Sequence, residues 1–160
     1  MSGGRRSPQP ISFRPAVASD IEFLYALHVA TMKEYVAQTW GWDETFQESR
    51  FRETFDPEDT RIITLDSRDI GMVATEERDA DVFLALIEVD PEHQHQGIGT
   101  AIIQKIIAAG IRQKKPVFLH VLRVNPARRL YERLGFSVVA ETPTHLHMRT
   151  KLPKDGTHDG

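Results

Sequence analysis

The spacing of apolar residues changes along this chain and divides it into strands and helices. Apolar residues stand in runs, or at every second position, over 11–14, 60–65, 70–75, 82–89, 117–124, 136–141 and 145–152, and this predicts strands. They stand three or four positions apart over 20–38, 44–55, 98–111 and 126–134, and this predicts helices. The predicted order is therefore β α α β β β α β α β β. It indicates an α/β fold, with a mixed sheet and helices on its faces.

Helix boundaries carry their own signals. Ser19 and Glu22 have the spacing of a capping box, and Asp43 is placed to cap the second helix. Asn125 followed by proline is a typical helix start, and Gly135 suits the residue after a helix end. The second helix is expected to turn Phe46, Phe51 and Phe55 inward and to carry a Glu48–Arg52 pair outside.

The length of the chain suits one domain with a substantial core. Of its 160 residues, 40% are hydrophobic and 27% are charged, which is typical of a globular protein. Segment 1–10 is rich in Gly, Ser, Arg and Pro, and segment 153–160 is polar. We therefore expect a domain over 11–152, with a flexible lead-in and a flexible tail.

Charge and composition narrow the class of protein. The net charge is −3 and no basic block is present, so nucleic acid is not an expected partner. Absence of cysteine excludes disulfides, thiolate metal sites and a thiol nucleophile. No apolar run approaches the roughly 20 residues of a membrane span, and the N-terminus lacks an apolar signal core. We expect a cytoplasmic protein that does not bind membranes.

The most informative segment joins the strand over 82–89 to the helix that begins at Ile98. Gly97 and Gly99 let the chain bend there and let a ligand approach the backbone. Free N–H groups at the start of a helix can receive an anion. An ordinary strand–helix connection is the alternative. The spacing fits neither the dinucleotide fingerprint nor the Walker loop.

Two motifs in this order resemble those of the GNAT N-acetyltransferase superfamily. Gln94-x-x-Gly97-x-Gly99, preceded by Val89-Asp90-Pro91, is similar to the family's loop for the pyrophosphate of acetyl-CoA. The string from Asn125 to Gly135-Phe136, with Tyr131 inside it, is similar to the second family motif. The opening segment 11–16 also resembles the family's first strand. The resemblance spans roughly 11–152 and implies the GNAT fold.

The resemblance implies acetyl-CoA as cosubstrate, without a metal. Backbone N–H groups of the loop would hold the pyrophosphate of acetyl-CoA. Its pantetheine arm would pair with the edge of the strand that ends at Val89. Asn125 matches a family residue that commonly contacts the cofactor arm, although it is also a good helix cap. The implied cofactor-binding residues are Ile87, Val89, Gln94, His95, Gln96, Gly97, Ile98, Gly99, Thr100 and Asn125.

The resemblance also implies transfer of acetyl to a primary amine. Tyr131 corresponds to the tyrosine that protonates the leaving thiolate, and packing in the core is the alternative. The family's usual carboxylate positions hold Phe83, Leu84, Ala85 and Leu86 here. Glu88 is the only acid in that strand, and it could be the base that deprotonates the amine. It could equally face solvent or pair with Arg123. His28, Glu34 and His120 are reserve candidates.

Acceptor specificity is expected between the first two helices. Tyr35, Trp40 and Trp42 stand there beside Asp43 and Glu44, and aromatic faces near carboxylates suit a cationic amine. The alternative is that both tryptophans pack the helix pair onto the sheet and that Asp43 is only a cap.

Several functions remain open at this level. The leading prediction is an acetyl-CoA-dependent N-acetyltransferase that acts on a small molecule or on a peptide or protein amine. The alternative is a non-catalytic acyl-CoA-binding or sensory domain of the same fold, and a longer acyl donor is a further possibility. A metal held by His93 and His95, or by His145 and His147, is not expected. The protein could be a monomer or a homodimer.

Overall fold

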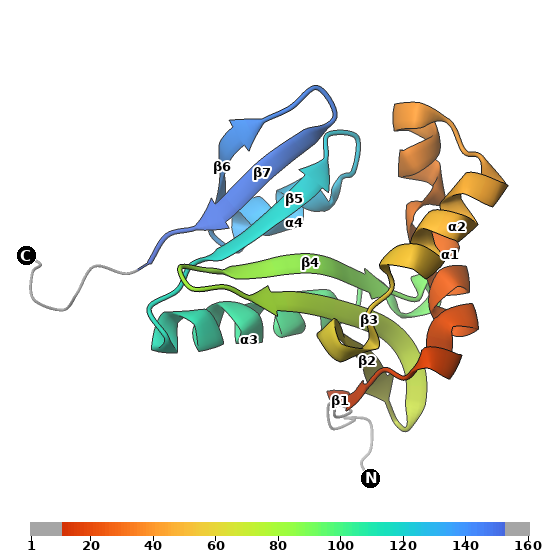
Figure 1. Cartoon of the computed structure of the whole chain (residues 1–160). Coiled ribbons are helices and arrows are strands. Elements are labelled where there is room, and N and C mark those ends of the chain that lie inside the picture. Colours follow the sequence, from red (N-terminus) through yellow and green to blue (C-terminus); the bar gives the residue numbers. More distant parts are fainter. Residues whose placement is uncertain (1–10, 153–160) are drawn as a thin grey trace, which may run out of the picture.

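The structure is a computed structural model that describes residues 11–152 (Figure 1). The lead-in and tail expected at 1–10 and 153–160 lie outside the described residues. Within the described range, no helix is both long and apolar enough to cross a membrane. The elements are β1 Ile11–Pro15, η1 Ala18–Asp20, α1 Ile21–Trp40, α2 Glu44–Thr54, η2 Pro57–Asp59, β2 Thr60–Leu65, β3 Arg68–Glu77, β4 Val82–Val89, η3 Pro91–His93, α3 Ile98–Arg112, β5 Val117–Leu122, α4 Ala127–Arg133, β6 Phe136–Glu141 and β7 His145–Thr150.

The strands of the described residues form one seven-stranded sheet in the order β1-β2-β3-β4-β5-β7-β6. All neighbours are antiparallel except β4 and β5, which are parallel. Parallel strands need a long crossover, and α3 supplies it here. The mixed sheet and the order of helices and strands expected from the sequence are confirmed; the three 3₁₀ turns were not predicted.

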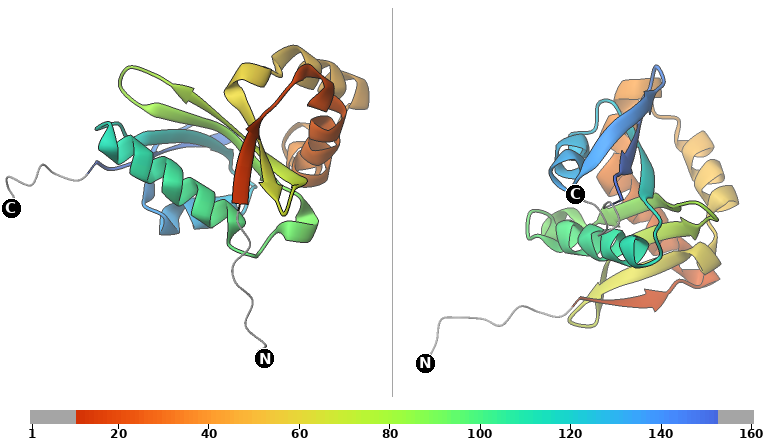
Figure 2. Two further views of the ribbon diagram at one scale, coloured as in Figure 1. Left: turned by 90° about the horizontal axis from the view of Figure 1, so that it is seen from below. Right: turned by 90° about the vertical axis from the view of Figure 1, so that its left-hand side faces the viewer.

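Helices cover both faces of the sheet. Figure 2 shows α3 and α4 on one face and α1 and α2 on the other. The α3 face buries the larger core, in which Ile102 and Ile103 of α3 pack on Leu119 and Met148. The α1 face buries a smaller core around Leu24, Leu27, Ile62 and Met72, with Phe51 and Phe55 of α2 at its side. The two cores hold β4 between them.

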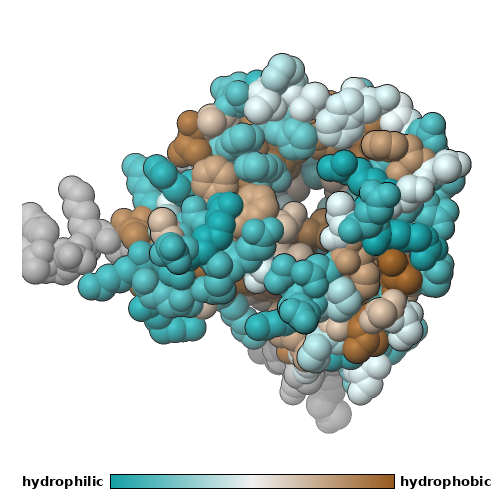
Figure 3. Space-filling model, in the orientation of Figure 1, coloured by the Kyte–Doolittle hydropathy of each residue, from teal (hydrophilic) through white to brown (hydrophobic). Residues whose placement is uncertain are grey.

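β4 and β5 separate soon after they begin. The register pairs only Val82 with Val117 and Phe83 with Phe118. Over the rest of β4, no described strand lies on the edge that faces β5, although β3 pairs along the other edge. Figure 3 shows the surface hollowed between the β5–β7 part and the α1–α2 part, beside this edge. This space between β4 and β5, called the opening below, exposes the backbone of β4.

A β-bulge in β4 decides which way Glu88 faces. The register of β3 against β4 skips Ala85. Leu84 packs into the core on the α3 face, whereas Leu86, only two residues later, packs against the core on the α1 face. Side chains two positions apart normally share a face, so the bulge turns Leu86 and Glu88 toward α1.

The expected capping box at the start of α1 is wrong. The 3₁₀ turn η1 precedes α1, and neither Ser19 nor Asp20 caps α1 with its side chain; Asp20 instead accepts from the backbone N–H that precedes η1. Val17 N–H donates to Asp20 Oδ2 at 2.8 Å. This bond to an ionised carboxylate is charge-assisted, so it satisfies the free backbone donor at the start of η1 well.

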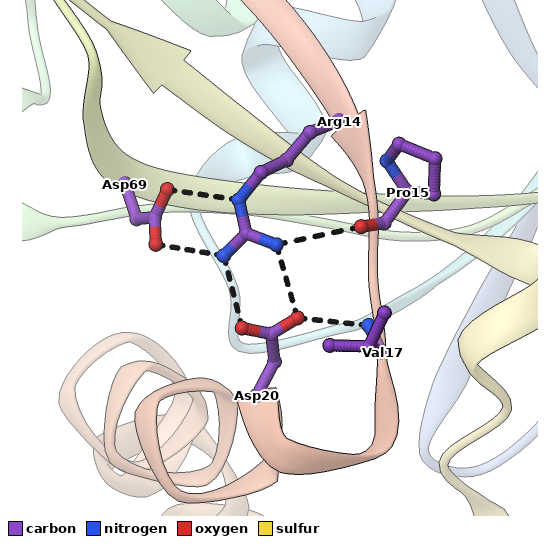
Figure 4. A network of polar contacts seen from close by, with 5 residues as sticks. All are labelled: Arg14, Pro15, Val17, Asp20 and Asp69. Carbon is purple, nitrogen blue, oxygen red and sulfur yellow. Dashed lines mark hydrogen bonds and ion pairs between the residues drawn. The ribbon is translucent and has the colours of Figure 1, made fainter.

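Arg14 of β1 holds this turn in place (Figure 4). Its Nη2 lies 2.9 Å from Asp20 Oδ1 and 2.8 Å from Asp69 Oδ2 of β3. The guanidinium therefore joins β1, β3 and the start of α1 through one planar group.

The second helix follows its sequence signals in part. Phe46 N–H donates to Asp43 Oδ1 at 2.9 Å, which confirms the cap, and Arg52 pairs with Glu48 at 2.8 Å. The expectation that Phe46 faces inward is wrong, because its side chain is 56% exposed. Phe46 stands five residues before Phe51, roughly 140° around a helix of 3.6 residues per turn, and so leaves the buried face.

Candidate active site

The end of β4 presents backbone groups to the opening. Asp90 N–H donates to the carbonyl of Ile70 on β3 at 2.7 Å. Alternate residues of a strand direct their N–H and carbonyl groups toward opposite edges. Val89, which precedes Asp90, therefore directs its N–H and its carbonyl toward the open edge, and Ile87 does the same.

Gln94 connects the loop to this edge. Its Nε2 donates to the carbonyl of Val89 at 2.9 Å. The bond holds the loop after β4 against the strand and uses one acceptor of the open edge. Among the described residues, the N–H of Val89 and both backbone groups of Ile87 have no backbone partner, so they are left for a ligand. The structure thus brings Ile87, Val89 and Gln94 together, and a shared cofactor site there stays a prediction.

The loop ends in a set of free donors at the start of α3. Gly97 caps α3 in the left-handed conformation, with φ 80°, and His95 also has a positive φ of 64°. A Cβ added at Gly97 or Gly99 would meet nothing within 4 Å. Several backbone N–H groups in the loop and in the first turn of α3 have no backbone acceptor within the described part of the chain. They are those of His95, Gln96, Gly97, Ile98, Gly99 and Thr100. These donors and the positive end of the helix dipole suit a phosphate group.

Glu88 is buried against α1. Its side chain is 2% exposed, and its Oε2 lies 2.8 Å from Nδ1 of His28. Its Oε1 has no hydrogen-bond partner among the described residues. Both alternatives considered for Glu88 are therefore wrong: it does not face solvent, and Arg123 pairs with Glu141 instead. An unpaired buried oxygen costs roughly 1–3 kcal/mol, and more when it is charged.

Tyr131 approaches the opening from the other face. It lies on α4, packs beside the larger core and meets the ring of Phe136 at 5.7 Å between centroids. Burial, and next the negative charge of Glu88, raise the pKa of Tyr131 to about 12. The hydroxyl is therefore protonated throughout the physiological range and can act as a proton donor.

Asn125 lies two residues before α4 and is followed by Pro126. Its Oδ1 accepts from the N–H of Ala127 at 2.9 Å, which confirms the cap. A second contact, to the cofactor arm, stays a prediction.

The aromatic residues near the α1–α2 junction have different environments. Trp42 is half-buried; its Nε1 donates to Glu44 Oε1 at 2.9 Å, and Lys33 Nζ lies 5.6 Å from its ring centroid. Glu44 also accepts from the hydroxyl of Tyr25. Trp42 and Glu44 thus have partners within the chain. Acceptor binding by Trp42 stays a prediction.

Trp40 and Tyr35 retain surface for a ligand. Trp40 is 59% exposed, and its ring lies 5.8 Å from that of His145 on β7. This contact joins the end of α1 to β7 across the opening. Tyr35 is half-buried on α1. Acceptor binding by either residue stays a prediction.

His145 and His147 separate rather than converge. His147 stacks on His120 of β5 at 3.9 Å between ring centroids, whereas His145 lies against Trp40. Within residues 11–152, no three His, Asp or Glu side chains gather in a way that could hold a metal ion.

Sequence reasoning gave His28 only a reserve role and missed the bulge. A signal for His28 existed, because it stands four residues after Leu24 and one after Leu27, both of which are buried on α1. The bulge at Ala85 had no sequence signal, because alanine has no preference for bulges comparable to that of glycine.

Comparisons with known proteins agree with this fold. The acetyltransferase (GNAT) domain family matches residues 57–138, more than half of the chain. The PaiA N-acetyltransferase from Thermoplasma acidophilum, solved in complex with coenzyme A, is 23% identical, with 89% of this chain and 99% of that chain covered and a TM-score of 0.70. An acetyltransferase from Thermus thermophilus is 19% identical, with 89% of this chain and 97% of that chain covered and a TM-score of 0.70.

A further solved structure has the same fold. The ribosomal-protein-S18-alanine N-acetyltransferase from Escherichia coli is 19% identical, with 91% of this chain and 98% of that chain covered and a TM-score of 0.65. At these identities the solved structures support the fold, whereas the domain match rests on the sequence itself. The chain belongs to the GNAT acetyltransferase family.

Proposed function

We propose that this protein is an acetyl-CoA-dependent N-acetyltransferase that acts on a primary amine. One observation carries the proposal: β4 and β5 separate after two paired positions, beside the free donors of α3 and next to a buried carboxylate. The opening offers a strand edge for an extended arm, donors for a phosphate and an acid for proton transfer. Few other ligands would use all three.

The residues around the opening fit acetyl-CoA. The free N–H groups from His95 to Thr100 would hold the pyrophosphate, and the absence of Cβ atoms at Gly97 and Gly99 leaves room there. The open edge at Ile87 and Val89 would pair with the amides of the arm, as an added strand does. When bound, acetyl-CoA supplies an acetyl thioester, and Val89 N–H would donate to its carbonyl oxygen.

Glu88 would remove the proton that blocks the acceptor. An alkylamine with a pKa of about 10.4 is almost fully protonated at pH 7, and freeing its lone pair there costs about 4–5 kcal/mol. Glu88 Oε1 has no partner among the described residues and can take this proton. General-base catalysis typically contributes about 10²- to 10⁴-fold, roughly 3–5 kcal/mol, which matches the requirement.

Tyr131 would supply the proton for the leaving sulfur. As the C–N bond forms and the C–S bond breaks, the acceptor nitrogen loses two protons in all. One passes through Glu88 to water, and the other replaces the proton that Tyr131 gives to sulfur. The charge of Glu88 is the second cause of the raised pKa of Tyr131. Proton uptake by Glu88 would remove that charge and make Tyr131 a better acid.

The acceptor is proposed as an amine of a small molecule or of a peptide or protein. One protein of the same fold, the Escherichia coli enzyme described above, is named for acetylating an alanine of ribosomal protein S18. The exposed Trp40 at the rim of the opening offers a surface against which such an acceptor could rest.

A thiol-release assay tests the proposal. Acetyl-CoA is offered with polyamines, aminoglycosides, free amino acids, and peptides with a lysine or a free N-terminus. Release that depends on one acceptor class would support the enzyme and name its substrate. Firm binding of acetyl-CoA without release for any acceptor would favour a non-catalytic acyl-CoA-binding domain.

A further inference from the structure

Glu88 has one paired and one unpaired oxygen, although its side chain is almost fully buried. Oε2 lies 2.8 Å from His28 Nδ1, whereas Oε1 has no partner among the described residues. A polar atom left unpaired in a buried position needs an explanation, and a ligand that arrives later is a common one. The asymmetry between the two oxygens points to His28 as the group that creates it.

The packing of α1 holds the His28 ring in place. Leu24 and Leu27, on the same part of the helix, are 0% and 4% exposed and anchor it to the sheet. The ring centroid of His28 lies 5.3 Å from that of Phe51 on α2. Two elements therefore fix the ring before any ligand binds.

The hydrogen bond between the two residues has a defined direction. An ionised carboxylate can only accept, so the Nδ1 of His28 must carry the hydrogen. The contact also crosses 60 positions of sequence, from α1 to β4. It therefore couples the helix that borders the opening to the strand that carries the proposed base.

We propose that His28 is a positioning residue for Glu88, whose Nδ1–H holds Oε2 and leaves Oε1 for the acceptor ammonium. The inference rests on the proposed function, because it assigns a partner to the proposed base. His28 itself takes no proton from the acceptor. One proton moves from the acceptor nitrogen to Glu88 Oε1, and His28 keeps the Nδ1 hydrogen throughout.

Kinetics of three variants test this role in the full chain. The acceptor is the one that gives the highest rate in the thiol-release panel. His28→Ala should lower kcat/KM for that acceptor by about 10- to 100-fold, less than the loss of a general base, while KM for acetyl-CoA stays the same. His28→Asn, whose amide N–H can replace Nδ1–H, should recover most of the rate. Ala30→Gln, on the exposed side of α1, is the control.

Thermal unfolding separates positioning from folding. If His28→Ala and His28→Asn unfold at the same temperature but differ in rate, the effect is not one of stability. Equal rates for the two variants, with both folded and able to bind acetyl-CoA, would overturn the proposal.

A spectroscopic test needs no acceptor. In the protein labelled with ¹⁵N-histidine, the Nδ1 of His28 should carry a hydrogen, and this signal should change in Glu88→Gln. The His28→Asn spectrum identifies which resonance belongs to His28. A His28 ring whose Nδ1 carries no hydrogen would contradict the proposal.

Failure of this inference is distinguishable from failure of the proposed function. If Glu88→Gln keeps its rate, Glu88 is not the base and the proposed mechanism falls together with the role of His28. If Glu88→Gln is slow but His28→Ala keeps full activity, the base stands and only the role of His28 is wrong.

Discussion

Glu88 and Tyr131 lie on opposite faces of the sheet, yet the charge of Glu88 raises the pKa of Tyr131. Glu88 faces α1 and pairs with His28, whereas Tyr131 packs on the α3 side. The two side chains can influence each other because β4 and β5 separate and leave no strand between them among the described residues. A thioester in the opening would lie between the proposed base and the proposed acid.

Replacing Tyr131 with Phe removes the proposed acid but keeps the ring. We expect kcat to fall by about 10²- to 10⁴-fold, the usual contribution of a general acid, with little change in acetyl-CoA affinity. Steady-state rates and calorimetric titration measure the two quantities. Tyr25→Phe is the matched control, because burial also raises the pKa of Tyr25 to about 12. An unchanged rate in Tyr131→Phe would remove Tyr131 from the mechanism.

Gly99→Asp should separate cofactor binding from folding. A Cβ at Gly99 meets no atom within 4 Å, and an acid in the first turn of a helix is favourable by about 0.3–1 kcal/mol. The folded protein should therefore be at least as stable as before. The added charge should repel the pyrophosphate and weaken acetyl-CoA binding. Calorimetry measures the affinity, and undiminished affinity would place the pyrophosphate elsewhere.

Gly71→Ala should disturb β4 through the backbone. A Cβ at Gly71 would lie 2.5 Å from the carbonyl oxygen of Glu88 and 3.2 Å from Cα of Val89. The strand must shift, and overpacking of this kind costs about 1–3 kcal/mol. We expect a lower free energy of unfolding together with slower turnover. Gly99→Ala, which meets open space, is the stability control; equal stability of the two variants would argue against this close approach.

Asp20→Asn should lower stability in a pH-dependent way. The hydrogen bond from Arg14 is the largest cause that holds the pKa of Asp20 below its usual value. A lowered pKa in the folded state means that the stabilisation is present above the unfolded pKa near 3.8 and is lost as the pH falls through the folded value. The variant should be about 1–3 kcal/mol less stable at neutral pH, and the difference should vanish in acid.

Chemical denaturation at a series of pH values measures this difference. Asp81→Asn is the matched control, because the Arg78–Asp81 pair joins residues three apart at an exposed turn and should contribute below about 1 kcal/mol. If the difference in unfolding free energy between wild type and Asp20→Asn persists unchanged into acid, the charge of Asp20 is not the cause of that difference.

Local sequence signals predicted the elements well, and contacts between distant residues account for what they missed. Asp43 and Asn125 cap the helices that they precede, because a cap depends on the next few residues alone. Ser19 is the capping residue that the sequence predicts for α1, but the 3₁₀ turn η1 precedes that helix, and the Asp20 carboxylate, held by Arg14, accepts from Val17 N–H instead. Arg14 is in turn held by Asp69, 55 residues away.

The orientation of Glu88 could not be read from the sequence. Alternation along β4 puts Glu88 on the same face as Leu84, and only the bulge at Ala85 turns it toward α1. Its partner His28 is 60 residues away. The Gly97 and Gly99 loop, by contrast, was recognisable because backbone donors at a helix start depend on consecutive residues.

We propose above all that the opening between β4 and β5, with the loop before α3, binds acetyl-CoA. Calorimetric titration of acetyl-CoA into the full chain tests it most directly. The structure leads us to expect one binding site per chain, with the affinity lowered by Gly99→Asp and retained in Tyr131→Phe. Absence of binding to a folded wild-type chain would contradict the account.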